Sequence, residues 1–291
     1  MLQMSTINHD SGLKIRIRVS QSNFQAITQD RTNKMPVIPN PEELERGTTP
    51  ATTPIRKHYF PPPKLRLQLN DLGHEGSSNF LFKVKGNEDI EEQVENVLNL
   101  LYQADSKRPG TRSVTFILRD MDGVAYTTGT DLDDDHKEIH INLNYIKNKD
   151  RHEILGVICH ELVHCFQWNA QGSCPGGLVE GIADWVRLNA GLAAKHWKQD
   201  AEGNWDAGYQ HTGYFLDYLE RRFGPGTVRS INGCLCERKY NEKRVFQDCC
   251  SGHTVDELWK DYRHSLEKKE RSDESFSNRD GNARDEAEHE R

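Results

Sequence analysis

The strongest constraint on the fold is the mostly apolar run EILGVICHELVHCFQW at positions 153–168. A helix of this composition must be buried inside a domain, because apolar residues lie on most of its faces. After Glu153, the polar residues that interrupt this run are His160, Glu161, His164 and Gln167. Four residues advance an α-helix by about 1.1 turns and ~6 Å, so both imidazoles can reach one metal ion. The HExxH spacing therefore predicts two metal ligands, with Glu161 offset as a base.

These five letters are weak evidence when taken alone, since a chain of this composition contains HExxH by chance in roughly one case in twenty. The competing interpretation is two structural histidines on a core-facing stripe beside a surface glutamate. A catalytic zinc needs a third protein ligand and an open position for water. The extended metzincin pattern would supply a histidine six residues after His164, but Ala170 stands there and Gln167 replaces the glycine of that pattern.

The next segment offers carboxylates for the missing ligand. Gly176 and Gly177 interrupt the helical pattern, and a new helix is predicted to begin with LVEGIADWVRL. Glu180 and Asp184 share one face of this helix. One carboxylate can bind the metal while the other supports it, and Asp184 is suitably placed to accept the second ring N–H of a ligand histidine. The neighbouring residues are largely apolar, so a solvated acidic pair is the less favoured interpretation.

The remaining sequence has its strands first and its helices later, which favours an α+β fold over repeated βαβ units. Alternating apolar residues predict strands at 65–69, 80–84, 113–118 and 139–143, with a glycine-containing loop between the last two. Helical periodicity predicts helices at 88–103, 151–169, 177–190, 208–222 and 255–268.

Residues 61–264 are expected to form one domain of the 291-residue chain. Residues 1–60 contain a Thr- and Pro-rich stretch, which predicts a disordered or loosely packed segment. Residues 265–291 are charged and are expected to form a disordered tail. The net charge of -7 argues against nucleic-acid and anionic-membrane partners. No apolar run has the length of a signal peptide or a membrane span, so we expect a cytoplasmic protein, with secretion by another route left open.

Four of the seven cysteines lie close together in the sequence, at positions 234, 236, 249 and 250. Free thiols, one or more disulfides, and a structural zinc site are three interpretations of this cluster. Paired zinc ligands are usually separated by two to four residues, which neither pair here achieves. Free thiols are therefore favoured, because free cysteine is commonly buried.

Three segments, in the order CHELVHCFQW, GGLVEGIADWVRL and WDAGYQHTGYFLDYLE, resemble the plant basic secretory protein family, whose relatives also occur in fungi and bacteria. The similarity continues through LRLQLNDLGHEGSSNFLF, TRSVTFILRDMDGVAYTTG and ELWKDY, and it runs from about residue 61 to 263. The resemblance implies a zincin-like fold, with N-terminal strands and a helix followed by the active-site helix and C-terminal helices. It also implies metallopeptidase activity of the gluzincin kind.

The resemblance also implies the roles of individual residues. It makes His160, His164 and Glu180 ligands of Zn²⁺ and makes Glu161 the general base. Asp184 matches the ExxxD pattern, in which the aspartate supports a ligand histidine.

A further family-like segment at 205–212 supplies Tyr209 or His211 to stabilise the oxyanion that forms during attack on a peptide carbonyl. The competing interpretation makes both residues structural, Tyr209 as a buried tyrosine and His211 as a residue at the start of a helix.

Together these features predict a zinc metallopeptidase that hydrolyses a peptide or protein substrate through a zinc-bound water activated by Glu161. The strand at 139–143 precedes the active-site helix, and as an edge strand it would align an extended peptide beside the zinc. Two alternatives stay open, a catalytically inactive binding protein on a zincin scaffold and a zinc hydrolase of a non-peptide amide or ester. The oligomeric state is not set by the sequence.

Overall fold

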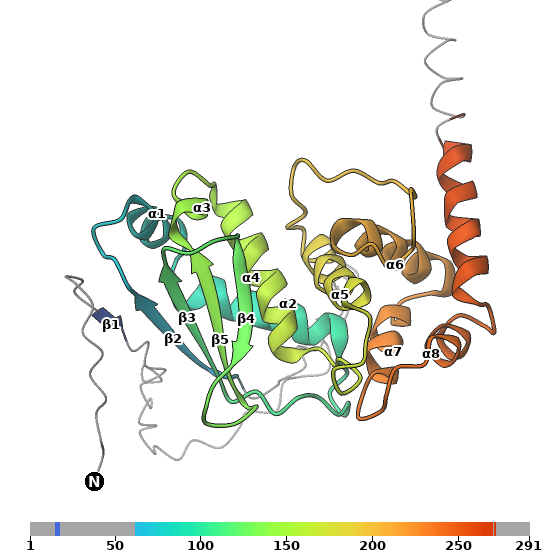
Figure 1. Ribbon diagram of the computed structural model, residues 1–291, viewed down its shortest axis with the longest axis horizontal. Helices are drawn as coiled ribbons and strands as arrows, with labels where there is room; N and C mark the ends of the chain where they lie inside the picture. Colours follow the sequence, from blue (N-terminus) through green and yellow to red (C-terminus); the bar gives the residue numbers. More distant parts are fainter. Residues whose placement is uncertain (1–14, 18–61, 270, 272–291) are drawn as a thin grey trace, which may run out of the picture.

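A mixed β-sheet and a group of helices occupy opposite ends of the computed structural model (Figure 1), which describes residues 15–17, 62–269 and 271. Most of the predicted N-terminal segment 1–60 and of the predicted tail 265–291 lies outside the described residues. The described part is a mixed α+β structure, as the order of strands and helices in the sequence predicts.

The sheet contains five strands in the order β1-β2-β3-β5-β4. Strands β2, β3 and β5 are parallel, whereas β1 and β4 pair antiparallel with their neighbours at the two edges. In sequence order the strands are β1 (Ile15–Ile17), β2 (Lys64–Leu69), β3 (Ser113–Arg119), β4 (Ala125–Gly129) and β5 (His136–Asn142). Parallel β2 and β3 are joined by a helical crossover, so this half contains a βαβ unit that the expected segregation of strands and helices lacks.

The strand order corrects one expectation about the substrate. The strand predicted at 139–143 corresponds to β5, which is paired on both sides and therefore has no free backbone edge. The edge next to it is β4, with Thr127 opposite Ile139. Residues 125–129 form this edge strand, although the sequence predicts a loop there. Gly123 and Gly129 are typical of loops, and the polar pair Thr127–Thr128 leaves no alternation of apolar residues.

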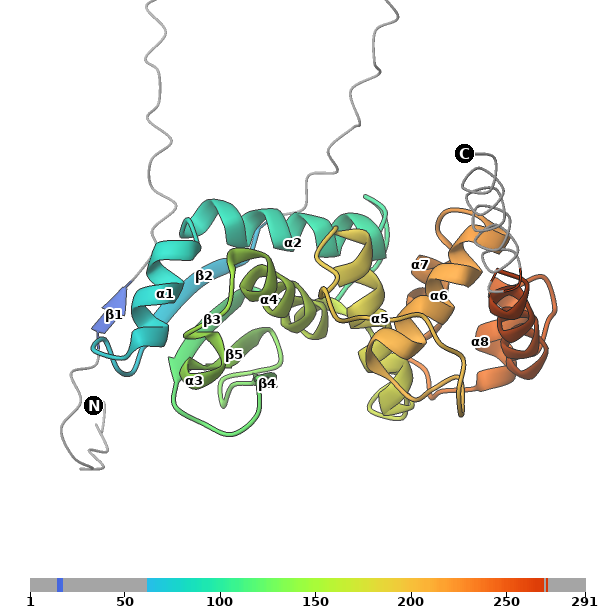
Figure 2. The same cartoon turned by 90° about the horizontal axis from the view of Figure 1, so that it is seen from above.

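One face of the sheet is covered by α2 (Asn87–Leu101) and α4 (Arg151–Phe166), which pack against each other (Figure 2). Alternate residues of β3, namely Val114, Phe116 and Leu118, are fully buried on this side. Helix α4 is capped by Asp150, whose carboxylate accepts a hydrogen bond of 2.9 Å from the backbone N–H of Glu153. The apolar run of the sequence thus forms the central helix of the core.

Helix α1 (Glu75–Lys83) replaces the strand predicted at 80–84. The alternating phenylalanines suggested a strand, but only Phe80 is buried while Phe82 faces solvent. His74 caps the helix by accepting a hydrogen bond of 2.9 Å from the backbone N–H of Gly76. Local capping therefore outweighs the alternation of apolar residues.

The second half of the molecule is helical. The helices expected at 151–169, 177–190, 208–222 and 255–268 are confirmed, apart from small shifts at their ends. The short helices α3, α7 and α8 were not predicted. The bounds are α3 Leu143–Ile146, α5 Gly176–Asn189, α6 Tyr209–Phe223, α7 Thr227–Cys234, α8 Glu242–Cys249 and helical residues 255–269. None of the helices in the described part of the chain combines the length and apolar character needed to cross a bilayer.

Candidate metal centre

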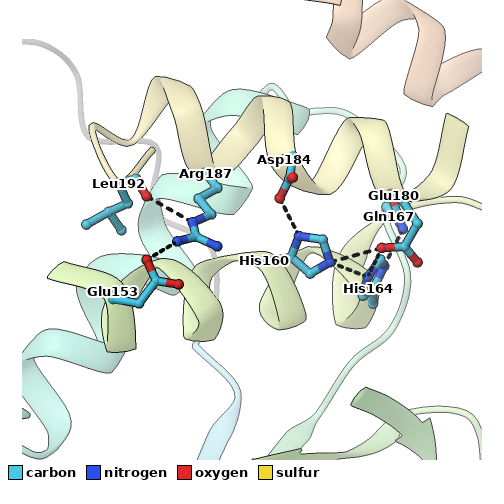
Figure 3. A network of polar contacts seen from close by, with 8 residues as sticks. All are labelled: Glu153, His160, His164, Gln167, Glu180, Asp184, Arg187 and Leu192. Atoms are coloured by element: carbon cyan, nitrogen blue, oxygen red, sulfur yellow. Dashed lines mark hydrogen bonds and ion pairs between the residues drawn. The ribbon is translucent and has the colours of Figure 1, made fainter. Parts of the chain in front are cut away.

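Helices α4 and α5 run antiparallel and face each other through a ladder of polar side-chain pairs (Figure 3). Residues spaced by three or four positions stay on one face of a helix, which is why these side chains line up. From one end of the ladder to the other the pairs are His164–Glu180, His160–Asp184 and Glu153–Arg187.

Three metal-binding side chains converge at one end of this ladder. Nε2 of His160 lies 3.1 Å from Oε2 of Glu180 and 3.2 Å from Nε2 of His164. The distance between Nε2 of His164 and Oε2 of Glu180 is 3.6 Å. The three donor atoms lie within 4.8 Å of one another, and in the described part of the chain this is the group of His, Cys, Asp or Glu side chains that could hold a metal ion. The structure therefore brings together the two histidines and the carboxylate predicted from the sequence.

The other ring nitrogen of each histidine has its own partner. Nδ1 of His160 is 2.7 Å from Oδ1 of Asp184, which is almost fully buried. Since a carboxylate only accepts, Nδ1 of His160 carries a proton, and Nε2 is the nitrogen that faces Glu180 and His164. Nδ1 of His164 contacts the side-chain amide of Gln167 at 2.7 Å. With this amide turned by 180°, Oε1 of Gln167, a buried atom without a partner, would accept the Nδ1 proton of His164.

The electrostatics of the cluster favour a positive charge at its centre. Burial would lower the pKa of His160, but hydrogen bonds to Asp184 and Glu180 outweigh it and raise that pKa to about 9. Burial would likewise raise the pKa of Glu180, yet the two imidazoles hold it well below its usual range. Electron-rich atoms this close repel one another unless a proton or a metal ion lies between them.

Glu161 projects from the same helix towards the sheet. Its carboxylate is buried, and Oε2 accepts a hydrogen bond of 2.6 Å from the Oγ1 hydroxyl of Thr127 on β4. Thr127 therefore fixes the orientation of the predicted base. No sequence motif indicates this contact, and the strand that carries Thr127 was itself not predicted.

Tyr209 lies beside the histidines at the start of α6. Its ring is nearly parallel to that of His160, with the ring centroids 6.1 Å apart. The negative charge of Glu180 and partial burial raise the pKa of Tyr209, so the hydroxyl stays protonated and can donate a hydrogen bond. Tyr209 has a left-handed backbone with φ of 46°, directly after Gly208 with φ of 92°. This turn presents the side chain at the cluster at a cost in backbone strain.

His211, the other residue predicted to stabilise an oxyanion, is not brought to the cluster. Its Nδ1 is 2.8 Å from Oδ1 of Asp200, and its Nε2 is 3.0 Å from the carbonyl oxygen of Asn204. Both ring nitrogens are engaged within the loop that precedes α6. This arrangement matches the structural interpretation of His211.

The Arg187–Glu153 pair closes the opposite end of the ladder. Nη2 of Arg187 donates to Oε2 of Glu153 at 2.9 Å, and its Nε donates to the carbonyl of Leu192 at 2.9 Å. Gly156 leaves room for the guanidinium, because a Cβ at this position would lie 2.5 Å from Nε of Arg187. The pair holds α5 against α4. It thereby helps to keep Glu180 and Asp184 in contact with the two histidines.

A cleft of about 710 Å³ opens over the cluster. Its walls come from the edge strand β4, from α4 and α5, and from the segment around Tyr209. The predicted ligands and Glu161 line it, as do Asp184, Tyr126 and Trp197. The metal-binding side chains, the candidate base and β4, the edge strand of the sheet among the described residues, thus line one cleft.

A family model with the description BSP, peptidase of plants and bacteria, matches residues 62–262. The match spans more than half of the chain and confirms the resemblance carried by the sequence motifs. No curated protein and no solved structure gives a significant match.

Proposed function

The chain belongs to this family of plant and bacterial peptidases, and we propose that it is a zinc-dependent metallopeptidase with a zincin-like fold. The convergence of His160, His164 and Glu180 carries the proposal. Glu161 adds a candidate base from the helix that supplies both histidines. Peptides and proteins are accordingly the proposed substrates.

The donor set fits zinc in both chemistry and spacing. Two imidazole nitrogens and one carboxylate oxygen form a known catalytic zinc set, which leaves a fourth position for water or substrate. Tetrahedral ligands at 2.0–2.1 Å from zinc are separated by about 3.3 Å. The separations of 3.1, 3.2 and 3.6 Å among His160, His164 and Glu180 bracket this value.

In the proposed reaction, zinc would serve as a Lewis acid that polarises the attacking water and the scissile carbonyl. Glu161 takes a proton from that water and returns it to the leaving amine. Thr127 keeps the Glu161 carboxylate oriented for both transfers. Asp184 keeps the proton of His160 on Nδ1, so that Nε2 stays free to bind the metal.

Tyr209 is the proposed donor to the oxyanion. Its hydroxyl is protonated at neutral pH, and its ring lies over the histidine cluster. A hydrogen bond to the developing negative charge stabilises the tetrahedral intermediate. His211 takes no part in this step, because its ring nitrogens are engaged by Asp200 and Asn204.

The substrate backbone is proposed to pair with β4. This strand lies at the edge of the sheet and lines the cleft, so its outer backbone groups can add an extended peptide as a further strand. Such pairing would hold the scissile bond beside Glu161 and the metal ligands. The free backbone edge of β4 therefore replaces the one first expected at 139–143.

The proposal is tested with a quenched fluorescent peptide library. The wild type, the metal-stripped protein, the zinc-reloaded protein and Glu161→Gln are compared, and bound zinc is measured in each sample. We expect zinc-dependent hydrolysis that falls about 10²–10⁴-fold in Glu161→Gln while zinc is retained. Glu95→Gln, on the exposed side of α2, removes one carboxylate elsewhere and should leave the rate unchanged.

Undiminished turnover by Glu161→Gln would overturn the proposed mechanism. Zinc binding without hydrolysis of any peptide would favour a binding protein on this scaffold. Hydrolysis of simple esters or amides in the absence of peptide cleavage would instead identify a zinc hydrolase of non-peptide substrates.

A further inference from the structure

Two cysteines at the ends of neighbouring helices face each other away from the proposed metal centre. Cys234 is the last residue of α7, and Cys249 is the last residue of α8. Their Sγ atoms are 3.6 Å apart, and both residues are free thiols with partly exposed side chains. We propose that Cys234 and Cys249 form a site of reversible disulfide formation that links α7 to α8.

The geometry requires only a small adjustment. A disulfide has an S–S distance of about 2.05 Å, so the sulfur atoms must approach each other by roughly 1.5 Å. Because each cysteine ends its helix, the linkage interrupts no helical hydrogen bond within α7 or α8.

The two thiols also differ in pKa, and thiol–disulfide exchange needs one thiol that ionises readily. A hydrogen bond from Cys249 lowers the pKa of Cys234 to about 7, and Arg244 contributes in the same direction. The hydrogen bond raises the pKa of Cys249, and burial adds to this effect, so it remains the protonated donor. The thiolate is the nucleophile in thiol–disulfide exchange, which makes Cys234 the attacking residue.

The other two cysteines of the cluster are less suited to this reaction. Cys250 is fully buried, which shields it from an oxidant. Burial raises the pKa of Cys236, so it carries less thiolate at neutral pH. Within the described residues, these cysteines belong to no group of three metal-binding side chains, which weighs against the structural zinc considered from the sequence.

Glutathione disulfide is the oxidant in the proposed reaction. The Cys234 thiolate attacks one of its sulfur atoms, which forms a mixed disulfide and releases one glutathione thiolate. Cys249 then attacks Sγ of Cys234 and displaces the second glutathione, and its proton passes to a glutathione thiolate. The protein loses two electrons and two protons, and glutathione disulfide takes up both to become two molecules of glutathione.

The linkage would stabilise a part of the fold that reaches towards the cleft. It closes a loop between residues 15 positions apart, and this loop contains α8. On α8, the ring of Phe246 packs against that of Trp205 with the centroids 5.0 Å apart. Trp205 begins the segment that leads to Tyr209, and its carbonyl accepts a hydrogen bond from Thr212. Oxidation is therefore expected to raise the unfolding temperature by about 6–12 °C.

The test is peptide mapping after oxidation of the full chain with excess glutathione disulfide. Trypsin yields one peptide spanning 230–238 and another spanning 245–260, each with two cysteines. The matched variants Cys236→Ser and Cys250→Ala remove the neighbouring thiols. We expect the two peptides to be linked in the wild type and in these variants, and to be unlinked in Cys234→Ser and Cys249→Ser.

Wild-type protein that keeps both peptides unlinked under these conditions would overturn the proposal. A linkage that persists in Cys234→Ser would also overturn it, because it would assign the disulfide to Cys236. If Cys234→Ser fails to fold, the wild type and the Cys236→Ser and Cys250→Ala variants still decide between these outcomes. The same samples, heated with and without reductant, measure the expected rise in unfolding temperature.

Discussion

The Oγ1 hydroxyl of Thr127 donates a hydrogen bond of 2.6 Å to Oε2 of Glu161, and so connects the edge strand to the helix that carries both histidines. One carboxylate oxygen is thereby held in place, and the other remains for the attacking water. The strand that aligns the substrate in our proposal also orients the base. Substrate position and base position are therefore set by the same element, β4.

We predict that Thr127→Val lowers kcat by about 10- to 100-fold, because a hydrogen bond to a charged group contributes about 1.5–3 kcal/mol. KM and zinc content should stay near their wild-type values, since Thr127 binds no metal in our proposal. Steady-state kinetics on a peptide identified in the library screen, together with elemental analysis, measures all three quantities.

Thr127→Ser is the matched control for this effect. Serine keeps the hydroxyl and removes only the methyl group, so it should restore most of the lost kcat. Equal losses in the valine and serine variants would show that packing of the edge strand, and not the hydrogen bond to Glu161, is responsible.

Asp184→Asn should weaken zinc affinity by about 10- to 100-fold, because Asp184 orients His160 and keeps the proton on its Nδ1. Glu180→Gln should weaken it further, since a proposed ligand is removed. Competition with a chromogenic zinc chelator gives both affinities. If Asp184→Asn binds zinc as tightly as the wild type, the hydrogen bond to His160 has no part in shaping the metal site.

Gly177→Ala should destabilise the protein by about 1–3 kcal/mol, because there is no room for the Cβ atom that the alanine adds. A Cβ at Gly177 would lie 1.7 Å from the carbonyl oxygen of Asp206, in the segment that leads to Tyr209. Urea denaturation measures the change in free energy of unfolding, and peptide hydrolysis should fall as well.

Gly176 provides a matched control one position earlier. A Cβ there would meet nothing within 4 Å, and the residue lies in the same first turn of α5. Gly176→Ala is expected to be neutral or to stabilise the protein by about 0.4–1 kcal/mol. A similar loss of stability in both variants would contradict the close approach seen at Gly177.

The sequence predicted the strongly periodic elements of this fold. The apolar runs that became β2, β3 and β5 and the helical periods of α2, α4 and α5 are set by burial, which leaves a clear pattern. Strand β4 was missed because an edge strand has one unpaired side and can be polar. The strand predicted at 80–84 was wrong because capping by His74 directs the chain into a helix.

The site was predictable where its residues share one helix face. Spacing of four residues placed His160 beside His164 and Glu180 near Asp184. The pairing of Glu153 with Arg187 was not predicted, because it depends on how α5 packs against α4. Thr127 is different, because its contact with Glu161 depends on how the sheet packs against α4. Such a contact joins distant parts of the chain, and spacing along the sequence carries no record of it.

Alkylation of Cys234 should proceed at lower pH than alkylation of an ordinary thiol. The hydrogen bond from Cys249 lowers the pKa of Cys234 to about 7, so the reactive thiolate is present above that pH. Cys249→Ala removes the donor and should move the midpoint of the pH–rate curve upwards. Mass spectrometry after short pulses of iodoacetamide measures the rate, with Cys236 in the same peptide as an internal reference. An unchanged midpoint in Cys249→Ala would rule out this source of activation.

The most direct test of the account is the zinc content of the purified protein, measured by elemental mass spectrometry beside His164→Ala and Cys234→Ser. We predict about one zinc per chain in the wild type and in Cys234→Ser, and loss of that zinc in His164→Ala. A wild-type protein that contains no zinc and cannot be reloaded, or zinc retained by His164→Ala, would contradict the assignment of the metal to His160, His164 and Glu180.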